Sequence, residues 1–598
     1  MREQTTVRRL IRFISYIFLL LLILFVATYI ALQTRWGAGY ASQLLSKFTD
    51  FDINVGIMGH RFAEPGKFIF QDIKIESRDK QLALNADQIV VDINWLNMIN
   101  GEAIQRLTIT QGELTAQISD TSTNLPISAK VLQFESSKIQ LTQGKNTLLV
   151  AGFTGGITPW KSTVNHPFGY GDFRFTTGEL AINSLPFRNV AMTGKLQEQV
   201  TEFSQVTGYL NNGYISGKGK VFADGSINID GLSMNKVGWQ NNLTFDALFE
   251  AINSDRTLQI KDLTLTDVDI QGQDWALSGL STEIDKINVV RGSWSNPKSK
   301  INFNVDQLVI HDQQVDTLIG ELNIDGDNLN FDKLSGYYNK GIFSLSGVWQ
   351  RNNKSLTITD GTLAGALYTL PEDWLTFFAQ PAPSWLSAFT IDNFTVTQSL
   401  LMNIQPEFSF EFTALSGTIR YVDLIKQKQW GIWKGQATFN ADSSTINQVM
   451  VRRPLLEIAS SNNSAAASLS GSTTRGIARV SLLVKQEYQK APFNLRATGT
   501  NIDLGDLNQW GWSGFSPQMW GDFDTSLQGD LLADPLAYSI NGELTAKPLQ
   551  GNEIYRTVVN GKVTPTVGTS MPPSEPQLAP DSPNTYPMDG HIPAIVNP

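Results

Sequence analysis

The chain has 598 residues, no cysteine and a formal net charge of −10 at pH 7. Without cysteine it has no disulfide framework, thiol nucleophile or thiolate metal site, and its acidic balance argues against nucleic acid, which needs clustered lysine and arginine. The length suggests several domains, although repetitive sheets escape that rule.

The chain begins with a basic head and an apolar run. Residues 1–12 hold four arginines and one glutamate, and residues 13–34 (FISYIFLLLLILFVATYIALQT) contain no charge. A helix of that length measures about 33 Å, enough to cross a bilayer core of ~30 Å. A cleaved signal peptide is the alternative, but its apolar core is shorter and ends at a small-x-small site. We predict one retained transmembrane helix, with residues 1–12 cytoplasmic and the remainder exported.

The periodicity of the sequence changes after the apolar run. Residues 35–50 have helical spacing and predict a juxtamembrane helix. From residue 51 to about 550, apolar and polar residues alternate, which is typical of half-buried strands in an antiparallel sheet. Asp224-Gly225 and Asp325-Gly326 predict hairpin turns. A Gly-x-Leu motif is predicted to open a strand at each of five places, namely Gly112, Gly178, Gly320, Gly361 and Gly542.

Helices are predicted to be few and short in the exported part. Candidates lie at residues 95–99, 372–389 and 504–512. The last 34 residues contain nine prolines, a density that excludes them from a strand ladder. We therefore expect one β domain over residues 51–550 and a disordered, proline-rich tail over residues 551–598.

The apolar side of this sheet is the candidate functional feature. Too few helices are predicted to cover it, so the sheet either closes on itself as a sandwich or barrel, or curls into an open trough. An open trough would expose more apolar surface than monomers usually do, and such surfaces bind something. Alternation alone leaves both possibilities open. The residues expected to line a groove are Ile89, Val91, Ile93, Phe173, Phe175, Phe408, Phe410 and Phe412.

Catalytic chemistry has little support in the sequence. Asp267 with Asp269, and Asp522 with Asp524, would each share a strand face, yet their neighbours are typical of a solvated surface. Residues 325–327 lack the spacing of a calcium loop, and no nucleophile, zinc or phosphate-loop motif is present. We predict no catalytic residue, no metal site and no cofactor.

Several stretches together resemble the AsmA family. Residues 94–115 (NWLNMINGEAIQRLTITQGELT) are similar to a run near the start of these proteins, and residues 493–512 (FNLRATGTNIDLGDLNQWGW) are similar to their C-terminal region. Further matches fall in order from about residue 32 to residue 545, while the proline-rich tail lies outside the pattern. The resemblance implies a protein anchored in the bacterial inner membrane, with a taco-like periplasmic β-groove and no catalytic motif.

Three functions follow as hypotheses. The first is a periplasmic lipid-binding protein that contributes to phospholipid transfer or homeostasis between the inner and outer membranes. The second is an assembly factor for outer-membrane proteins, which would bind polypeptide at strand edges or in the groove. The third, ranked last, is an envelope glycan hydrolase. About 25 strands would stack to roughly 120 Å at most, so we expect transfer between membranes to need a partner, an oligomer or a shuttle.

Overall fold

The computed structural model describes residues 2–565 except 96–102, 118–127, 145, 162–168, 184, 253–256, 291–292, 295–298, 312, 375–379, 407, 462 and 488–489. The chain divides into two compact units, Met1–Leu469 (unit 1) and Ser470–Pro598 (unit 2). The sequence had suggested one β domain over residues 51–550.

Two helices precede the strands of unit 1. They are α1 (Arg2–Leu32) and α2 (Arg35–Phe48), and the Thr34 hydroxyl accepts the Gly37 N–H at 3.4 Å to cap α2. Within the described residues, no single helix meets the length and hydropathy of a membrane span; Ile17–Leu32 and Arg35–Phe48 meet them only as a pair, bent by 77°.

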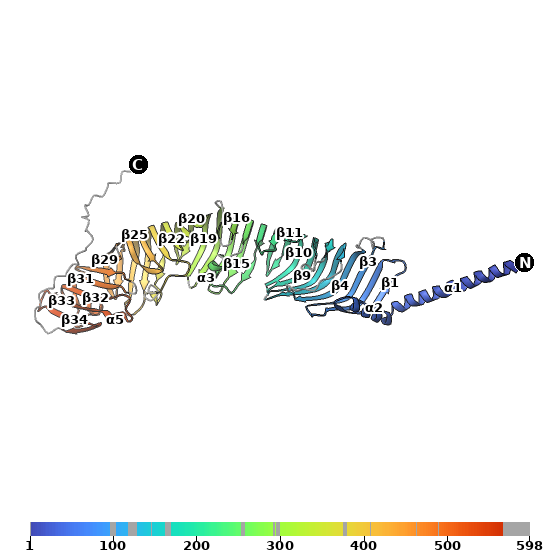
Figure 1. Cartoon of the computed structure of the whole chain (residues 1–598). Helices are drawn as coiled ribbons and strands as arrows, with labels where there is room; N and C mark the ends of the chain where they lie inside the picture. The colour runs from blue at the N-terminus through green and yellow to red at the C-terminus, as the bar shows by residue number, and fades with distance from the viewer. Residues whose placement is uncertain are drawn as a thin grey trace, which may run out of the picture. The chain divides into compact units, whose positions relative to one another are not determined.

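Strands make up most of the rest of unit 1 and follow one another along it (Figure 1), and most of them hydrogen-bond with strands close to them in the chain, while β5 and β8 pair only with each other. Because their side chains alternate between two faces, one face gathers the apolar residues. The first half comprises β1 (Phe51–His60), β2 (Lys67–Ser77), β3 (Leu82–Ile93), β4 (Ile104–Gln117), β5 (Ser128–Ala129), β6 (Val131–Gln143), β7 (Asn146–Thr158), β8 (Trp160–Lys161), β9 (Gly171–Ile182), β10 (Leu185–Leu196), β11 (Val200–Leu210), β12 (Gly213–Phe222), β13 (Ile227–Asn235) and β14 (Gly238–Gln240).

A short helix, α3 (Phe245–Ile252), separates the two halves of unit 1 in the chain. The second half comprises β15 (Leu258–Gln271), β16 (Trp275–Val290), β17 (Ser293–Trp294), β18 (Ser299–Ile310), β19 (Gln313–Asp325), β20 (Asn328–Tyr338), β21 (Gly341–Gln350), β22 (Ser355–Ala364), β23 (Leu367–Thr369), β24 (Ala388–Asn403), β25 (Phe410–Lys426), β26 (Gln429–Asn440), β27 (Ser443–Ile446), β28 (Val449–Ser461) and β29 (Ser464–Ser472), which ends in unit 2.

Parallel neighbours interrupt the otherwise antiparallel ladder at three places. β4 pairs in parallel with β6, β13 and β14 with β15, and β22 and β23 with β24. Parallel neighbours cannot be joined by a tight turn and need a crossover segment. The crossovers run through residues 118–130, 236–257 and 365–387. The predicted sheet was purely antiparallel, so these joins are a finding of the structure.

Bulges lie in the middle of many strands. The register shifts within one strand, and a neighbouring residue takes a left-handed backbone conformation, as at Ser136 (φ 49°), Asn189 (φ 48°) and Asp267 (φ 54°). A bulge bends its strand and increases the local twist. A row of bulges across the sheet therefore folds it along its length.

Helix α2 covers the free edge of β1. The Ser42 hydroxyl accepts the Val55 N–H at 2.9 Å, and the Ser46 hydroxyl accepts the Ile53 N–H at 2.8 Å. Residues four apart lie on one side of a helix, so both serines face the strand. Two backbone donors that a further strand would otherwise take are thereby satisfied.

Unit 2 has several strands and its own core. Its elements are β30 (Ile477–Lys485), β31 (Pro492–Asp503), the 3-10 helix η2 (Leu504–Asn508), β32 (Trp520–Asp530), α5 (Leu536–Ser539), β33 (Asn541–Pro548), β34 (Ile554–Val559) and β35 (Lys562–Pro565). Leu504 and Leu507 of η2 pack with Phe523 and Leu544 of the sheet, and three of these four side chains are completely inaccessible to solvent or nearly so. The predicted helical turn at residues 504–512 is therefore present as η2 and the residues after it.

Several predicted boundaries need correction. β34 and β35 lie beyond residue 550, where we had placed the start of the tail, because the proline density rises only after Pro565. Asp325-Gly326 begins the hairpin between β19 and β20, whereas the turn at Asp224-Gly225 is longer than the two residues predicted. Of the other predicted helices, residues 96–99 and 375–379 lie outside the described residues.

The Gly-x-Leu motif does not open strands. Four of its glycines, including Gly112 of β4 and Gly320 of β19, lie inside strands, and only Gly542 lies near the start of one. A Cβ atom on Gly320 would lie 2.5 Å from Cζ of Phe303 on the neighbouring strand. At Gly320 and Gly361 of this motif a phenylalanine ring of a neighbouring strand occupies the space above the backbone, whereas at Gly178 that space is open.

Candidate functional site

Apolar side chains form continuous rows across the strands of unit 1. Each row joins residues that are register partners on successive strands, so its members lie side by side on one face. One row is Ile53, Ile75, Leu84, Leu114, Ile139, Val150, Leu180, Phe187 and Leu210. Another is Phe68, Val91, Leu107, Leu132, Ile157, Phe173, Gly194, Phe203, Gly219, Ile229 and Ile260.

The rows continue through the second half of unit 1. They pass through the clusters around Val305, Phe343, Phe331 and Ile391, which are 3–9% exposed. We call the face that carries all of these rows the apolar band. One row of this half is Leu263, Ile284, Ile301, Leu322, Phe331, Gly347, Ile358, Ile391 and Val422.

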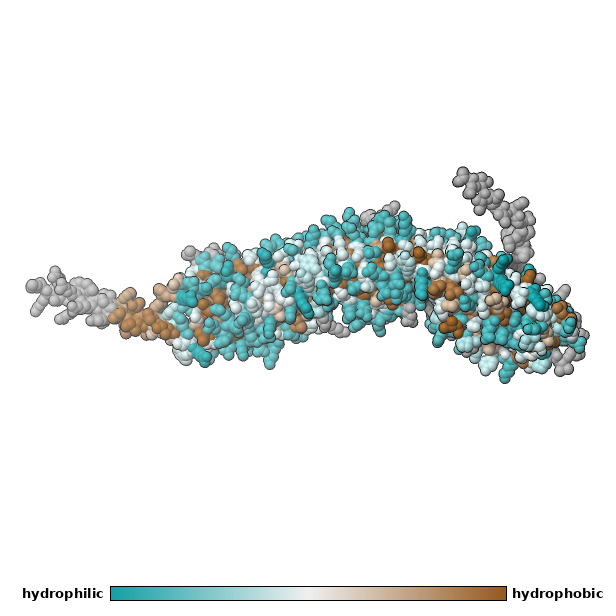
Figure 2. All heavy atoms as spheres, turned by 180° about the vertical axis from the view of Figure 1, so that it is seen from behind, coloured by the Kyte–Doolittle hydropathy of each residue, from teal (hydrophilic) through white to brown (hydrophobic). Residues whose placement is uncertain are grey.

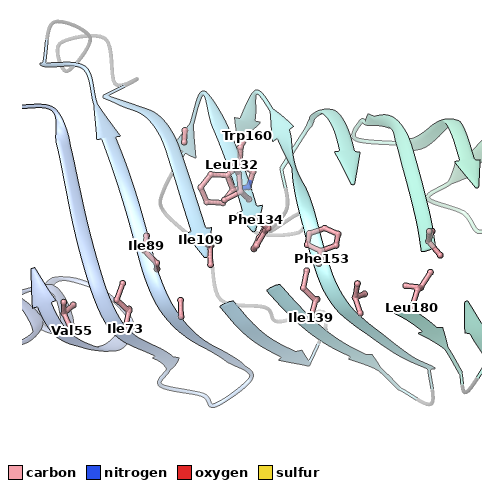
Figure 3. Close-up of a cluster of buried hydrophobic side chains, with 14 of the residues drawn as sticks. Val55, Ile73, Ile89, Ile109, Leu132, Phe134, Ile139, Phe153, Trp160 and Leu180 are labelled. Atoms are coloured by element: carbon pink, nitrogen blue, oxygen red, sulfur yellow. The ribbon is translucent and has the colours of Figure 1, made fainter. Parts of the chain in front are cut away.

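The band is well buried although no helix layer covers it. Ile73 is 4% exposed, Ile109 5% and Leu132 3%, and Figure 3 shows these side chains along one face of β2, β4 and β6. Among the described residues, α2 packs on β1, and no helix packs extensively on β2 to β28. Trp160 of the short β5–β8 pair packs in the same buried cluster as Leu132 and Phe134, so it covers part of the band. Most of the shielding must therefore come from the sheet itself.

A contact between two crossovers shows that the sheet curls. The Phe245 N–H donates to Asp274 Oδ1 at 2.7 Å, at the edge of the sheet where β16 begins. Trp385 belongs to a cluster with Ile425, at the opposite edge, where β24 begins. The rings of Phe245 and Trp385 nevertheless meet edge to face, with centroids 6.5 Å apart. Segments attached to the two long edges of the sheet therefore meet here, and we use the word groove for the space along the band between these edges.

Phenylalanines opposite glycines recur along the band. Phe303 is the register partner of Gly320, and Phe331 of Gly347. In the second pair a Cβ atom on the glycine would lie 2.6 Å from Cζ of the ring. The ring therefore lies over the backbone of the next strand, where only glycine leaves room. Such pairs keep the wall of the groove apolar and free of gaps.

The predicted groove-lining residues fall into two groups. Ile89 and Phe173 are 7% and 6% exposed and lie in the band, where Val91 and Phe175 pack as half-buried neighbours. Ile93 pairs with Ile104 at the edge of the same region. The rings of Phe408, Phe410 and Phe412 follow one another with centroids 6.2 and 5.7 Å apart, and Phe412 pairs with Leu401. Phe408 precedes β25 and is 51% exposed.

The spacing of the band residues was missed in the sequence. On β2 the inward side chains are Phe68, Phe70, Ile73 and Ile75, an i, i+2, i+5, i+7 pattern rather than strict alternation. Asp72 has a left-handed backbone conformation (φ 53°), and the side chains after it face inward at positions two apart again, although the register with β1 and β3 does not shift. A search for this spacing would have found the middle of the band, which simple alternation divides into two short strands.

The acidic pairs proposed as catalytic candidates have structural partners. Asp269 Oδ1 accepts the Gly279 N–H at 2.9 Å, and Asp522 Oδ1 accepts the Asn501 N–H at 2.8 Å. Asp524 binds the Arg496 guanidinium, with Nη2 2.7 Å from Oδ2, and this contact raises the pKa of Arg496. Within the described part of the chain, no three His, Asp or Glu side chains gather as metal ligands would.

Tyr338, at the rim of the band, has a side chain that stays uncharged. Burial raises the pKa of Tyr338 to about 12, so its hydroxyl remains a donor, to Gln313 Oε1 at 2.5 Å. Outside the band the surface over the strands is largely hydrophilic in the view of Figure 2. The chemistry available to the site is therefore burial of apolar groups.

The sequence as a whole is similar to one curated bacterial protein. The AsmA family protein YicH of Escherichia coli (strain K12) is 26% identical over 565 residues, which cover 94% of this chain and 99% of the relative. No family model matches the chain, and no solved structure matches it. The similarity extends over the residues of both units rather than over a shared motif.

Proposed function

This chain is a homologue of the AsmA family protein YicH, and from that premise we propose that it is a membrane-anchored carrier of lipid acyl chains. The groove lined by the apolar band holds the chains while the polar headgroup stays in water. In a bacterial envelope this activity contributes to phospholipid transfer or homeostasis between the inner and outer membranes. The protein acts by binding and needs no catalytic group.

The observation that carries the proposal is the continuity of the apolar rows. Each strand repeats the same apolar face as its neighbour, about 4.8 Å further along. Burial contributes about 0.8 kcal/mol for each methylene removed from water. Because neighbouring positions offer nearly the same burial, an acyl chain moves from one strand to the next without a large change in free energy. A closed protein core has no such repeated, accessible positions.

The exposed helix α1 supports a membrane location. Side chains from Ile17 to Val26 are apolar and 43–68% exposed, and Figure 2 shows this part as a brown segment at one end of the molecule. An apolar helix with no protein packed around it is stable in a bilayer. The arginines of residues 1–12 place the N-terminus in the cytoplasm, so the sheet is periplasmic and the anchor lies in the inner membrane.

Site-specific photocrosslinking in living cells tests the proposal. A photoreactive amino acid replaces Phe175, which is half-buried in the band, or Thr176, the next residue of β9, which is exposed. Cells are labelled with radioactive phosphate before irradiation. We expect phospholipid adducts at position 175 and none at position 176.

Two outcomes would contradict the proposal. Equal labelling at positions 175 and 176 would indicate non-specific capture. Adducts to outer-membrane proteins at position 175, without lipid, would favour the assembly-factor alternative instead.

A further inference from the structure

Helix α2 exposes an apolar stripe. Trp36 is 76% exposed, Tyr40 58%, Leu44 41% and Phe48 79%. These residues recur every four positions and so lie along one side of the helix. An exposed surface of this kind is unusual on a helix that belongs to a water-soluble domain.

The other side of α2 is fixed to the sheet. Ala38 is completely buried, and Ser42, 8% exposed, holds the Val55 backbone by the hydrogen bond described above. Ser46 does the same for Ile53. The stripe therefore points away from β1, and α2 cannot turn it inward without breaking both hydrogen bonds.

The direction of α2 follows from its angle to α1. The apolar part of α1 and α2 meet at 77°. The end of α1 is held against the sheet, because the Tyr29 hydroxyl donates to the His60 carbonyl at 2.8 Å and its ring meets that of Phe62 edge to face. If α1 crosses the bilayer along its normal, α2 lies nearly parallel to the membrane surface.

We propose that α2 is an interfacial helix whose stripe is embedded in the periplasmic surface of the bilayer that α1 crosses. A helix with one apolar and one polar side binds at the boundary between headgroups and acyl chains, and tryptophan and tyrosine favour that layer. Lys47 is exposed near the same side, and its long stem lets the ammonium group reach lipid phosphates. The occupant is the lipid surface because the stripe continues the exposed apolar surface of α1.

The interfacial helix deepens the proposed function, on which it rests only for the orientation of α1. Because Ser42 and Ser46 bind β1, embedding α2 places the first strand of the band at the bilayer surface. Ala38 of α2 belongs to the same buried cluster as Val55 and Ile73. The membrane-facing end of the groove is therefore formed by a helix that lies among lipid headgroups.

The absence of cysteine allows a direct test. Single-cysteine variants Tyr40→Cys and Leu44→Cys of the full chain carry a nitroxide label and are reconstituted in vesicles of phosphatidylethanolamine and phosphatidylglycerol. Collision with oxygen, which concentrates in the acyl layer, is compared with collision with a water-soluble nickel chelate. Leu24→Cys in α1 is the membrane control, and Asn353→Cys, in the exposed turn after β21, is the water control.

We expect the labels at positions 40 and 44 to favour oxygen over nickel at least severalfold relative to position 353, as at position 24. Nickel accessibility at positions 40 and 44 equal to that at position 353 would overturn the interfacial helix. This result, together with lipid adducts at position 175, would leave the proposed function intact. Membrane-embedded labels without any lipid adduct would instead refute the carrier and keep the helix.

Discussion

The apolar face of unit 2 is covered by a segment of its own chain, whereas the apolar band of unit 1 is covered by other segments only in places, by α2, by the β5–β8 pair and by the residues before β24. In unit 2 the segment after β31 places Leu504, Leu507, Trp512 and Phe515 over the strands, and the first two are 0% exposed. In unit 1 many band residues, among them Val91 and Phe175, are only half-buried. Half-buried apolar residues also surround the core of unit 2, so the difference between the units is the segment that covers the strands, which is extensive in unit 2 and partial in unit 1.

The difference separates two roles for apolar residues. The apolar side chains of a covered face are fully buried on folding and stabilise the fold. Those of a less covered face are only partly buried on folding, and the remaining burial takes place when a ligand binds. Removing side chains should therefore affect mainly stability in unit 2 and mainly binding in unit 1. Four predictions follow from this comparison.

The largest effect on stability is expected in the closed core. Leu507→Ala should cost about 3–5 kcal/mol, because it leaves a cavity in a fully packed site. Leu114→Ala, in the half-buried band of β4, should cost about 1–2 kcal/mol, because less burial is lost. Hydrogen exchange of the strands around each site, followed by mass spectrometry of the full chain, measures both. Equal destabilisation would remove the distinction between the units.

A charge in the band should affect binding more than folding. Phe175→Glu puts a carboxylate in the path of acyl chains, so phospholipid adducts from a crosslinker at the nearby band position Phe134 should fall at least tenfold. The matched control, Thr176→Glu, lies on the outer side of the same strand and should leave the adducts unchanged. Protease resistance of unit 1 checks that both variants fold. Normal lipid capture by folded Phe175→Glu would contradict the groove.

The phenylalanine–glycine pairs predict a smaller, compensable effect. Gly320→Ala should cost about 1–3 kcal/mol by overpacking, since its Cβ would lie 2.5 Å from Cζ of Phe303. Shortening the ring by Phe303→Leu should recover part of the loss. A double-mutant cycle followed by hydrogen exchange of β18 and β19 measures the coupling. Additive effects would show that the ring does not occupy the space over Gly320.

The smallest effect concerns a carboxyl group of the segment that covers unit 2. Burial, and secondarily the charge of Asp503, raises the pKa of Asp506. The folded pKa exceeds the unfolded value, so folding favours the protonated acid, and stability falls as the pH rises through the folded pKa. Asp506→Asn should therefore stabilise unit 2 at neutral pH. The gain should vanish below the unfolded pKa of the carboxyl; a gain that persists there would refute this origin.

Much of the architecture could be predicted from the sequence. Period-two alternation identified the strands, and the helical spacing of residues 35–50 and 504–512 identified α2 and the segment around η2. These features are local, because they depend on residues a few positions apart. The eight proposed groove residues were chosen in the same way, and their contact with lipid stays a prediction.

The parallel joins, the irregular positions within strands and the curl of the sheet depend on contacts between distant residues, which the alternation of apolar and polar residues does not predict. The left-handed residue Gln111 changes which later positions of β4 face inward, and the parallel join of β4 to β6 depends on a distant pairing. The approach of Phe245 to Trp385 joins residues 140 positions apart in the chain. The curl of the sheet, on which the site depends, therefore arises from long-range geometry rather than from any single strand.

The two serines of α2 have a consequence for assembly. The first strand of a long sheet has one edge with unpaired N–H and C=O groups, and another copy of the chain can pair with them. Fibrils grow by repeated pairing of this kind. Ser42 and Ser46 occupy two of the donors that such a copy would need. A small helix thereby blocks end-to-end polymerisation of a very long sheet at β1.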